Sequence, residues 1–355
     1  MSKAAAALIA ALTLVAPASA AKPISLPKLA RSLVKDGSPG AIVYVRTPTA
    51  ARAGTAGFAD RAARVSMRAA DRYRIASLTK AFVSVVVLQL DAEGKLNIDD
   101  SVGRWLPGLV PNGGAITLRE LLNHTSGLYD YTEDQGFGDA LLAAPGYTWT
   151  PRELLAYAFA HPAWAAPGSE FHYSNTNYIL LGLVAEAVGG KPLAQQLQER
   201  IFTPLELTST SLPITIDVDA AFVHGYLTLE GSPLIDVTTL LSPSYAWAAG
   251  GIVSNARDIT TFYRALLGGR LLPAAQLAEM KTPVPATHTY GLGIDTTFTN
   301  CGRAFGHRGD FVAWRNEVLA TPNGKREAVV MVNVDQQHVD WDTVDGAVQA
   351  AFCRG

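Results

Sequence analysis

The residues with the clearest chemical potential are serine–lysine pairs three positions apart. Such pairs include Ser19–Lys22, Ser32–Lys35 and Ser77–Lys80. A serine hydroxyl becomes a strong nucleophile only when a base removes its proton, and a lysine can be that base only when it is neutral. The spacing could therefore supply a nucleophile together with its base, but several such pairs in one chain show that spacing alone does not identify it.

The surrounding sequence separates the three pairs. Ser77 opens a segment, predicted as a helix over residues 77–93, whose apolar residues recur at helical spacing. In a helix this spacing puts Ser77 and Lys80 on one face, and burial there would lower the Lys80 pKa. Ser32–Lys35 ends a short predicted helix, where a solvated lysine is the plain explanation, and Ser19–Lys22 spans a predicted cleavage site. The alternative for Ser77 is a helix-capping serine with an incidental lysine.

Two further polar side chains could complete such a site. Tyr173 and Asn175 lie two apart in a polar loop of the middle of the chain. A phenol can relay protons between nucleophile, lysine and leaving group, and an amide can hold a substrate carbonyl. The alternative is an ordinary loop before a helix near Tyr178, with Asn175 or Asn177 as its cap.

A third group lies near the C-terminal end, in the sequence Gly306-His307-Arg308-Gly309-Asp310. His307 could orient the tyrosine or the substrate, and the glycines could let a substrate approach the strand backbone. Arg308 and Asp310 are two apart and so share one face of a strand. The backbone N–H of Asp310 could join that of Ser77 in an oxyanion hole. The alternative for His307 is a purely structural histidine.

The elements that must position these groups follow from periodicity. We expect helices over 26–35, 118–123, 151–160, 178–188 and 342–352, and strands over 41–46, 51–58, 305–307, 311–319 and 326–333, with Asn323-Gly324 marking a hairpin. Strands come from both ends of the chain and helices from its middle. The sequence therefore predicts an α/β sandwich formed by residues 21–95 and 240–355, a mostly helical inserted subdomain over 96–239, and a cleft between them.

Composition narrows the class of protein. The formal net charge is −2 with no basic block, so a nucleic-acid partner is not expected, and no His-Glu-x-x-His or other metal-ligand spacing occurs. Residues 1–20 have a basic start, an apolar run and small residues before Ala21, which predicts a signal peptide, export, and no membrane span afterwards. Cys301 and Cys353 could form one disulfide or remain two buried thiols, and export favours the disulfide.

Three motifs in order carry a resemblance to a known family. Ser77-x-x-Lys80, Tyr173-x-Asn175 and His307-x-Gly309 resemble the motifs of the penicillin-recognising serine hydrolases, in the branch of class C β-lactamases and soluble D-alanyl-D-alanine carboxypeptidases. The resemblance extends over nearly the whole chain after the leader. The segments 121–128, 248–254 and 290–293, which lie between the motifs, also resemble that branch. The positions of Cys301 and Cys353 resemble those of the carboxypeptidases.

This resemblance implies a β-lactamase/transpeptidase-like fold and an acyl-enzyme on Ser77. Lys80 and Tyr173 would share the proton transfers, Asn175 would hold the acyl side, and His307 would replace the usual cation. It implies no metal or organic cofactor, and substrates that are small peptides, amides, esters or β-lactams, with peptidoglycan stem peptides among them. A secreted or periplasmic D-alanyl-D-alanine carboxypeptidase-type peptidase is the first expectation.

One departure limits that expectation. Carboxypeptidases of the family usually meet the terminal carboxylate with small hydroxyl residues beside the third-motif glycine, whereas Arg308 and Asp310 stand here. Arg308 could bind a carboxylate, and Asp310 could repel it or pair with Arg308. Asp295 adds another negative charge nearby. An esterase or a D-aminopeptidase or D-amidase therefore remains an alternative, as does a non-catalytic peptidoglycan-binding module.

Overall fold

A computed structural model describes residues 23–216, 218–229 and 233–355. The predicted signal peptide at 1–20 lies outside the described residues, so export stays a prediction. Among the residues that the structure describes, no helix is both long and apolar enough to cross a membrane.

The centre of the molecule is a seven-stranded antiparallel sheet with strand order β3-β2-β1-β11-β10-β9-β8. Its strands are β1 Gly40–Arg46, β2 Ala51–Asp60, β3 Val65–Ser66, β8 Asp295–Thr299, β9 Gly302–Phe311, β10 Trp314–Ala320 and β11 Glu327–Val332. Residues from the two ends of the chain thus pair in one sheet, as the strand pattern predicted. The meander differs in detail, because the β9–β10 turn falls at 312–313 and Phe311 therefore ends β9 instead of opening β10.

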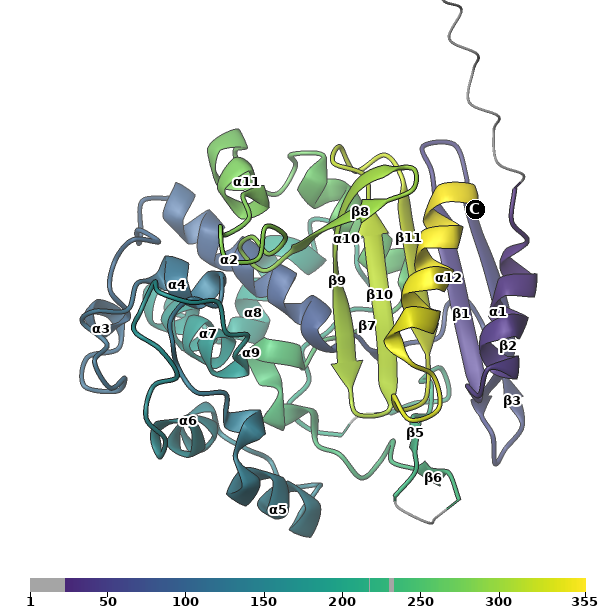
Figure 1. Cartoon of the computed structure of the whole chain (residues 1–355), viewed down its shortest axis with the longest axis horizontal. Coiled ribbons are helices and arrows are strands. Elements are labelled where there is room, and N and C mark those ends of the chain that lie inside the picture. The colour runs from purple at the N-terminus through teal and green to yellow at the C-terminus, as the bar shows by residue number, and fades with distance from the viewer. Residues whose placement is uncertain (1–22, 217, 230–232) are drawn as a thin grey trace, which may run out of the picture.

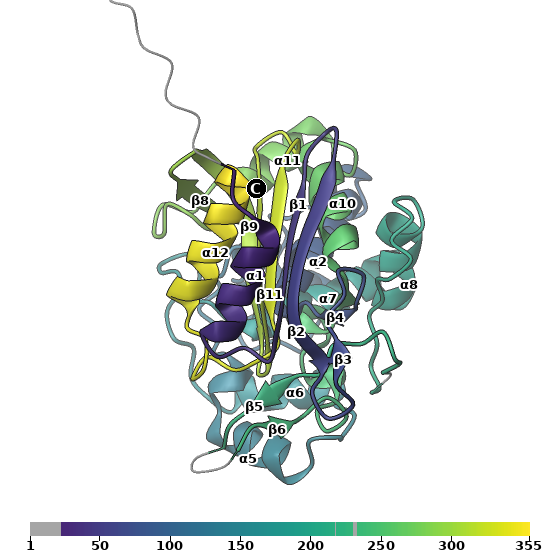
Figure 2. The same cartoon turned by 90° about the vertical axis from the view of Figure 1, so that its right-hand side faces the viewer.

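Two helical layers cover the sheet (Figures 1 and 2). One face carries α1 Leu26–Lys35 and α12 Trp341–Arg354, which pack over a core that includes Val43, Val330 and Phe352. The other face carries α2 Thr79–Ala92 and α10 Ala256–Leu267, whose rings Phe82 and Phe262 stack with centroids 3.6 Å apart. Because the sheet is covered on both faces, nearly every residue of β1, β10 and β11 is buried, and the sequences of β1 and β11 are almost continuously apolar.

The middle of the chain supplies a group of helices beside α2 (Figure 1). They are α3 Val102–Trp105, α4 Leu118–Leu122, α5 Gln135–Ala143, α6 Pro151–Phe159, α7 Asn175–Gly189 and α8 Leu193–Leu197. Thr117–Glu120 and Thr150–Glu153 form capping boxes that begin α4 and α6. Two further helices are α9 Trp247–Gly250 and α11 Ala274–Lys281. Two short strand pairs complete the fold: β4 Tyr73–Arg74 pairs with β7 Val253–Ser254, and β5 Tyr226–Leu227 pairs with β6 Ile235–Asp236.

This arrangement confirms the predicted fold class, an antiparallel sheet flanked by helices with a mostly helical insertion. The exact domain boundaries stay a prediction. A disulfide joins Cys301, in the turn between β8 and β9, to Cys353 near the end of α12. The predicted bridge is therefore confirmed, and it ties the C-terminal helix to the edge of the sheet.

Candidate active site

Ser77 lies where the chain turns sharply from β4 into α2. Ala76 has φ of +52°, a conformation that few residues other than glycine adopt, and residues 76–78 form a 3₁₀ turn before α2 begins at Thr79. The helix thus starts two residues later than predicted. Neither the turn nor α2 has a side-chain capping bond, so the interpretation of Ser77 as an ordinary helix cap is wrong.

Lys80 lies completely buried in the first turn of α2, and its amine has three oxygen neighbours. Its Nζ atom is 3.1 Å from Ser77 Oγ, 2.8 Å from Asn175 Oδ1 and 2.7 Å from the carbonyl oxygen of Ala249. Burial lowers the Lys80 pKa to about 7. Because the amide and carbonyl oxygens only accept hydrogen bonds, a neutral amine that donates to both directs its lone pair at the serine hydroxyl.

Tyr173 covers this amine from the helical side. Lys80 Nζ lies 4.8 Å from the centroid of the Tyr173 ring, and the Tyr173 hydroxyl is hydrogen-bonded to Ser77. Burial raises the Tyr173 pKa well above its usual range, so the phenol keeps its proton at neutral pH. The opposite pKa shifts of Lys80 and Tyr173 suit a base and a proton donor on one serine.

Asn175 is the first residue of α7, but its side chain does not cap the helix. Its amide oxygen accepts from Lys80, and its Nδ2 donates to Asp130 Oδ2 over 2.9 Å. The same Asp130 oxygen accepts the Asn175 backbone N–H, so a buried carboxylate fixes the orientation of the amide. Asp130 carries no motif in the sequence, where it is a lone aspartate after Leu128-Tyr129, so it was not predicted as a site residue.

His307 is hydrogen-bonded to Tyr290 and not to Tyr173. It ends a chain of hydrogen bonds from His124 through Tyr290, in which the donor and the acceptor of each bond can be assigned. The Ser174 N–H donates to His124 Nδ1, which leaves the His124 proton on Nε2, 3.2 Å from Tyr290 Oη. Tyr290 can then donate to His307 Nε2 over 3.1 Å, and His307 Nδ1 donates to the Arg308 carbonyl.

Burial lowers the His307 pKa to about 3, so this histidine is neutral and does not supply the cation that the family resemblance implied. The ring of His124 also stacks on Tyr173 with centroids 4.2 Å apart. His124 and Tyr290 thus position the candidate site, although the sequence singled them out only as parts of linking segments.

Arg308 and Asp310 of β9 form ion pairs with residues of neighbouring elements and not with each other. Arg308 makes an ion pair with Asp345 of α12, and Asp310 lies 3.3 Å from Arg315 Nε of β10. The expected pairing of Asp310 with Arg308 is therefore wrong, because each residue faces a charge supplied by a neighbouring element.

Gly309 lies against the backbone that precedes the serine. A Cβ atom at this position would lie 2.4 Å from the carbonyl oxygen of Ile75. The chain just before Ser77 therefore approaches the strand closely at this position, and the approach of a substrate along the strand stays a prediction. Gly309 lets β9 lie directly against the turn that presents the serine.

Ser77 lines two cavities. The Tyr173 cavity, about 380 Å³, is also lined by Tyr173, Asp295, His307 and Arg308. The Tyr245 cavity, about 310 Å³, contains Asn175 and is otherwise mainly apolar, with Tyr131, Phe137, Leu141, Tyr245 and Val312 on its walls. Within the described part of the chain, no group of three or more His, Cys, Asp or Glu side chains could hold a metal ion.

An antiparallel sheet between helical layers, with a serine and a buried lysine one turn apart, defines the class of penicillin-recognising serine hydrolases. The chain belongs to the beta-lactamase family, whose family model (Beta-lactamase) matches residues 26–351. It is a serine hydrolase of that family, as the order of its motifs predicted.

Individual relatives differ in their named activities. The chain is 29% identical over 267 residues to a putative penicillin-binding protein of Bacillus subtilis and 30% identical over 254 residues to a putative D-alanyl-D-alanine carboxypeptidase of Escherichia coli. These matches cover 75% and 62% of this chain, but only 64% and 58% of the two relatives. A D-stereospecific amidohydrolase from Streptomyces sp. is 39% identical with a TM-score of 0.84, covering 91% of this chain and 97% of that one.

Proposed function

We propose that this protein is an amidohydrolase that forms an acyl-enzyme on Ser77 and acts on amides of D-amino acids. The observation that carries the proposal is the distribution of charge around the serine. The base beside it is an amine whose pKa is about 7, and the cations near its leaving-group side are already paired.

The acylation step uses two side chains in opposite protonation states. Neutral Lys80 accepts the Ser77 hydroxyl proton while Oγ bonds to the amide carbon. The carbon–nitrogen bond then breaks, and the nitrogen takes the proton of the Tyr173 hydroxyl, which Lys80 restores to the phenolate. Water next attacks the acyl carbon and gives a proton to Lys80 and Tyr173. The bond from the acyl carbon to Ser77 Oγ then breaks, and Oγ takes that proton back. No metal or organic cofactor is part of this scheme.

The Tyr173 cavity is the leaving-group side in this proposal, because Tyr173 must reach the departing nitrogen. A free terminal carboxylate would find a neutral His307 there, an Arg308 that is bound to Asp345, and the carboxyl of Asp295. These groups suit an uncharged amide better than the carboxylate of a D-alanyl-D-alanine peptide. We therefore place an amidase before the carboxypeptidase that the motifs suggested first.

The Tyr245 cavity is the acyl side, since it contains Asn175. Its aromatic and aliphatic walls favour an acyl group with a large apolar side chain, such as that of phenylalanine. The relationship to the Streptomyces amidohydrolase supports preference for the D enantiomer.

The test is a substrate comparison on the purified protein, with Ser77→Ala as the blank. D-phenylalanine amide, L-phenylalanine amide, a nitrophenyl ester and a diacylated Lys-D-Ala-D-Ala peptide are compared by kcat/KM. We expect the D-amide to exceed both the L-amide and the D-Ala-releasing reaction. Robust release of D-alanine with negligible amide hydrolysis would show that the carboxypeptidase assignment is correct, and hydrolysis of the ester alone would show an esterase.

The same samples separate an enzyme from a binding module. A fluorescent penicillin or fluorophosphonate should label the unmodified protein and not Ser77→Ala. If neither protein is labelled and both bind peptidoglycan fragments equally, the chain is a non-catalytic module.

A further inference from the structure

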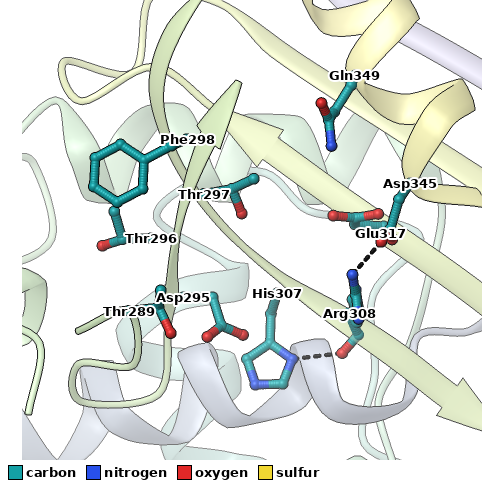
Figure 3. Close-up of a pocket in the computed structure, with 10 residues that line it drawn as sticks. All are labelled: Thr289, Asp295, Thr296, Thr297, Phe298, His307, Arg308, Glu317, Asp345 and Gln349. Atoms are coloured by element: carbon teal, nitrogen blue, oxygen red, sulfur yellow. Dashed lines mark hydrogen bonds and ion pairs between the residues drawn. The ribbon is translucent and has the colours of Figure 1, made fainter. Parts of the chain in front are cut away.

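A third cavity, about 470 Å³, adjoins the Tyr173 cavity and is rich in carboxyl groups (Figure 3). It lies between β8, β9, β10 and α12, and we call it the acidic cavity. Its charged walls are the carboxyls of Asp295, Glu317 and Asp345 and the guanidinium of Arg308. The two cavities share Thr289, Asp295, His307 and Arg308, so the acidic cavity continues the space that begins at Ser77.

Strand register brings these carboxyls together. Arg308 pairs with Glu317 across β9 and β10, and Asp295 pairs with Gly306 across β8 and β9. Directly paired residues point to the same face, and so do residues two apart along β9. Asp295, Arg308 and Glu317 therefore all point to the face that α12 covers, where Asp345 meets them.

Glu317 is the unusual member of this group. Its side chain lies in the middle of β10 with the residue only 4% exposed, and Figure 3 shows it directed into the cavity. No N–H or hydroxyl of the described residues donates to its Oε2 atom or to Asp345 Oδ1, and the only hydrogen bond between the two side chains is one in which a protonated Glu317 donates to Asp345. Arg308 bonds only the other oxygen of Asp345. The two carboxyl groups are therefore satisfied only while Glu317 keeps its proton, and its ionisation is costly unless a ligand in the cavity supplies a donor.

The pKa directions agree with this description. Burial, and then a hydrogen bond to Asp345, raise the Glu317 pKa well above its usual range, and burial raises the Asp295 pKa to about 6. An entering cation would stabilise the ionised carboxylates and would donate the missing hydrogen bonds. Among the described residues, no three or more His, Cys, Asp or Glu side chains are arranged to hold a metal ion. An organic cation is therefore the occupant that fits these carboxyls.

We propose that the acidic cavity binds the cationic side chain of the leaving group, so that amides whose amine portion is a basic amino acid with an amidated carboxyl group are preferred substrates. This inference rests on the proposed function, which assigns the Tyr173 cavity to the leaving group. The ammonium or guanidinium end would contact Glu317 and Asp345, while Asp295 would attract it at the junction of the two cavities.

The first experiment measures binding without turnover. Lysinamide and norleucinamide differ only by the terminal ammonium, and both are titrated calorimetrically into Ser77→Ala. We expect lysinamide to bind at least about tenfold more tightly, in keeping with the coupling between close charges at an interface. This preference should be lost in Ser77→Ala with Glu317→Gln. Equal affinity for the two amides in Ser77→Ala would overturn the inference.

Two further variants keep the experiment decisive. Asp345→Asn frees the Arg308 cation and should abolish the preference even if the Glu317 variant fails to fold. Asp342→Asn, one turn earlier on the exposed side of α12, is the matched control and should keep the preference. Loss of the preference in the control alone, with the Glu317 and Asp345 variants unaffected, would also refute the site.

Turnover then distinguishes the inference from the function on which it rests. D-phenylalanyl-lysinamide and D-phenylalanyl-norleucinamide are compared by kcat/KM in the unmodified protein. A lysine-to-norleucine ratio of about ten supports the subsite, and a ratio near one overturns it. If neither compound nor D-phenylalanine amide is hydrolysed, the proposed function fails, and the calorimetric result still decides whether the cavity binds a cation.

Discussion

Lys80 Nζ lies 3.1 Å from Ser77 Oγ, and its other neighbours are two oxygens that can only accept hydrogen bonds. This geometry makes the protonation state of one buried amine the quantity that controls the serine. The amine can receive the serine proton only after it has lost its own, so pH should control acylation directly.

The first prediction is the pH dependence of acylation. Because burial lowers the Lys80 pKa to about 7, the fraction of neutral lysine rises with pH through that value. We expect kcat/KM for an uncharged amide to rise about tenfold per pH unit below the midpoint and to level off above it. A profile that is flat from pH 5 to 9 would contradict the assignment of Lys80 as base.

Lys80→Arg is the matched variant for this prediction. Arginine retains a positive charge at every accessible pH and cannot accept the serine proton. Activity should fall about 10²- to 10⁴-fold, the usual contribution of a general base. If Lys80 acted only as a fixed positive charge, the arginine variant would retain much of its activity, and the rate of labelling by penicillin measures the difference.

The second prediction concerns Asp130, whose negative charge raises the Lys80 pKa against the stronger effect of burial. Asp130→Asn removes that charge, so the acid limb of the pH profile should move to lower pH. The maximal rate should nevertheless fall about tenfold, because Asn175 loses the carboxylate that orients its amide. A pH profile that moves in the opposite direction would exclude this electrostatic role.

The residues around Ser77 also show which parts of the site the sequence predicts and which it does not. The sequence identified two pairs of site residues, Ser77 with Lys80 and Tyr173 with Asn175. The members of each pair are close in sequence, and the order of the pairs along the chain is distinctive. Asp130 reaches Asn175 across 45 positions. A contact of that kind leaves no local pattern in a single sequence.

The same limit explains the error at β9. The alternation of a strand correctly placed Arg308 and Asp310 on one face. Their partners, however, are Asp345 of α12 and Arg315 of β10, which depend on how the helix packs on the sheet. The strand and helix periods predicted the layers, whereas the charge pairing between layers required the three-dimensional structure.

The third prediction concerns Tyr290, the middle of the chain from His124 to His307. Tyr290→Phe leaves a buried N–H of His124 and a buried nitrogen of His307 without partners, which should destabilise the fold by about 1–3 kcal/mol. Because the two histidines line or support the Tyr173 cavity, kcat/KM should fall more for substrates with large leaving groups than for a simple amide. Equal losses for both substrates would indicate a purely structural role.

The fourth prediction concerns the disulfide between Cys301 and Cys353, which closes a segment of 52 residues. Replacing both cysteines by serine should lower the free energy of unfolding by about 2–4 kcal/mol. Urea denaturation measures this change. Penicillin labelling of Ser77 under native conditions should persist, since neither cysteine lines the Tyr173 or the Tyr245 cavity.

The fifth prediction tests the charge of the leaving-group side through Asp295, which lines the Tyr173 cavity and the acidic cavity. With a pKa of about 6, Asp295 is mostly ionised at pH 7.5 and should repel a terminal carboxylate. Asp295→Asn should therefore raise kcat/KM for release of D-alanine from a D-Ala-D-Ala peptide by about three- to tenfold, the effect of a partly screened charge.

The pH dependence of that gain supplies the control. Below pH 5 the aspartate is protonated in the unmodified protein, so the advantage of the asparagine variant should shrink toward one. Asp342→Asn, on the exposed side of α12, should give no gain at either pH. An increase that is equally large at pH 5 and pH 7.5 would mean that the Asp295 side chain acts by its shape, and the electrostatic explanation for disfavouring a free carboxylate would be wrong.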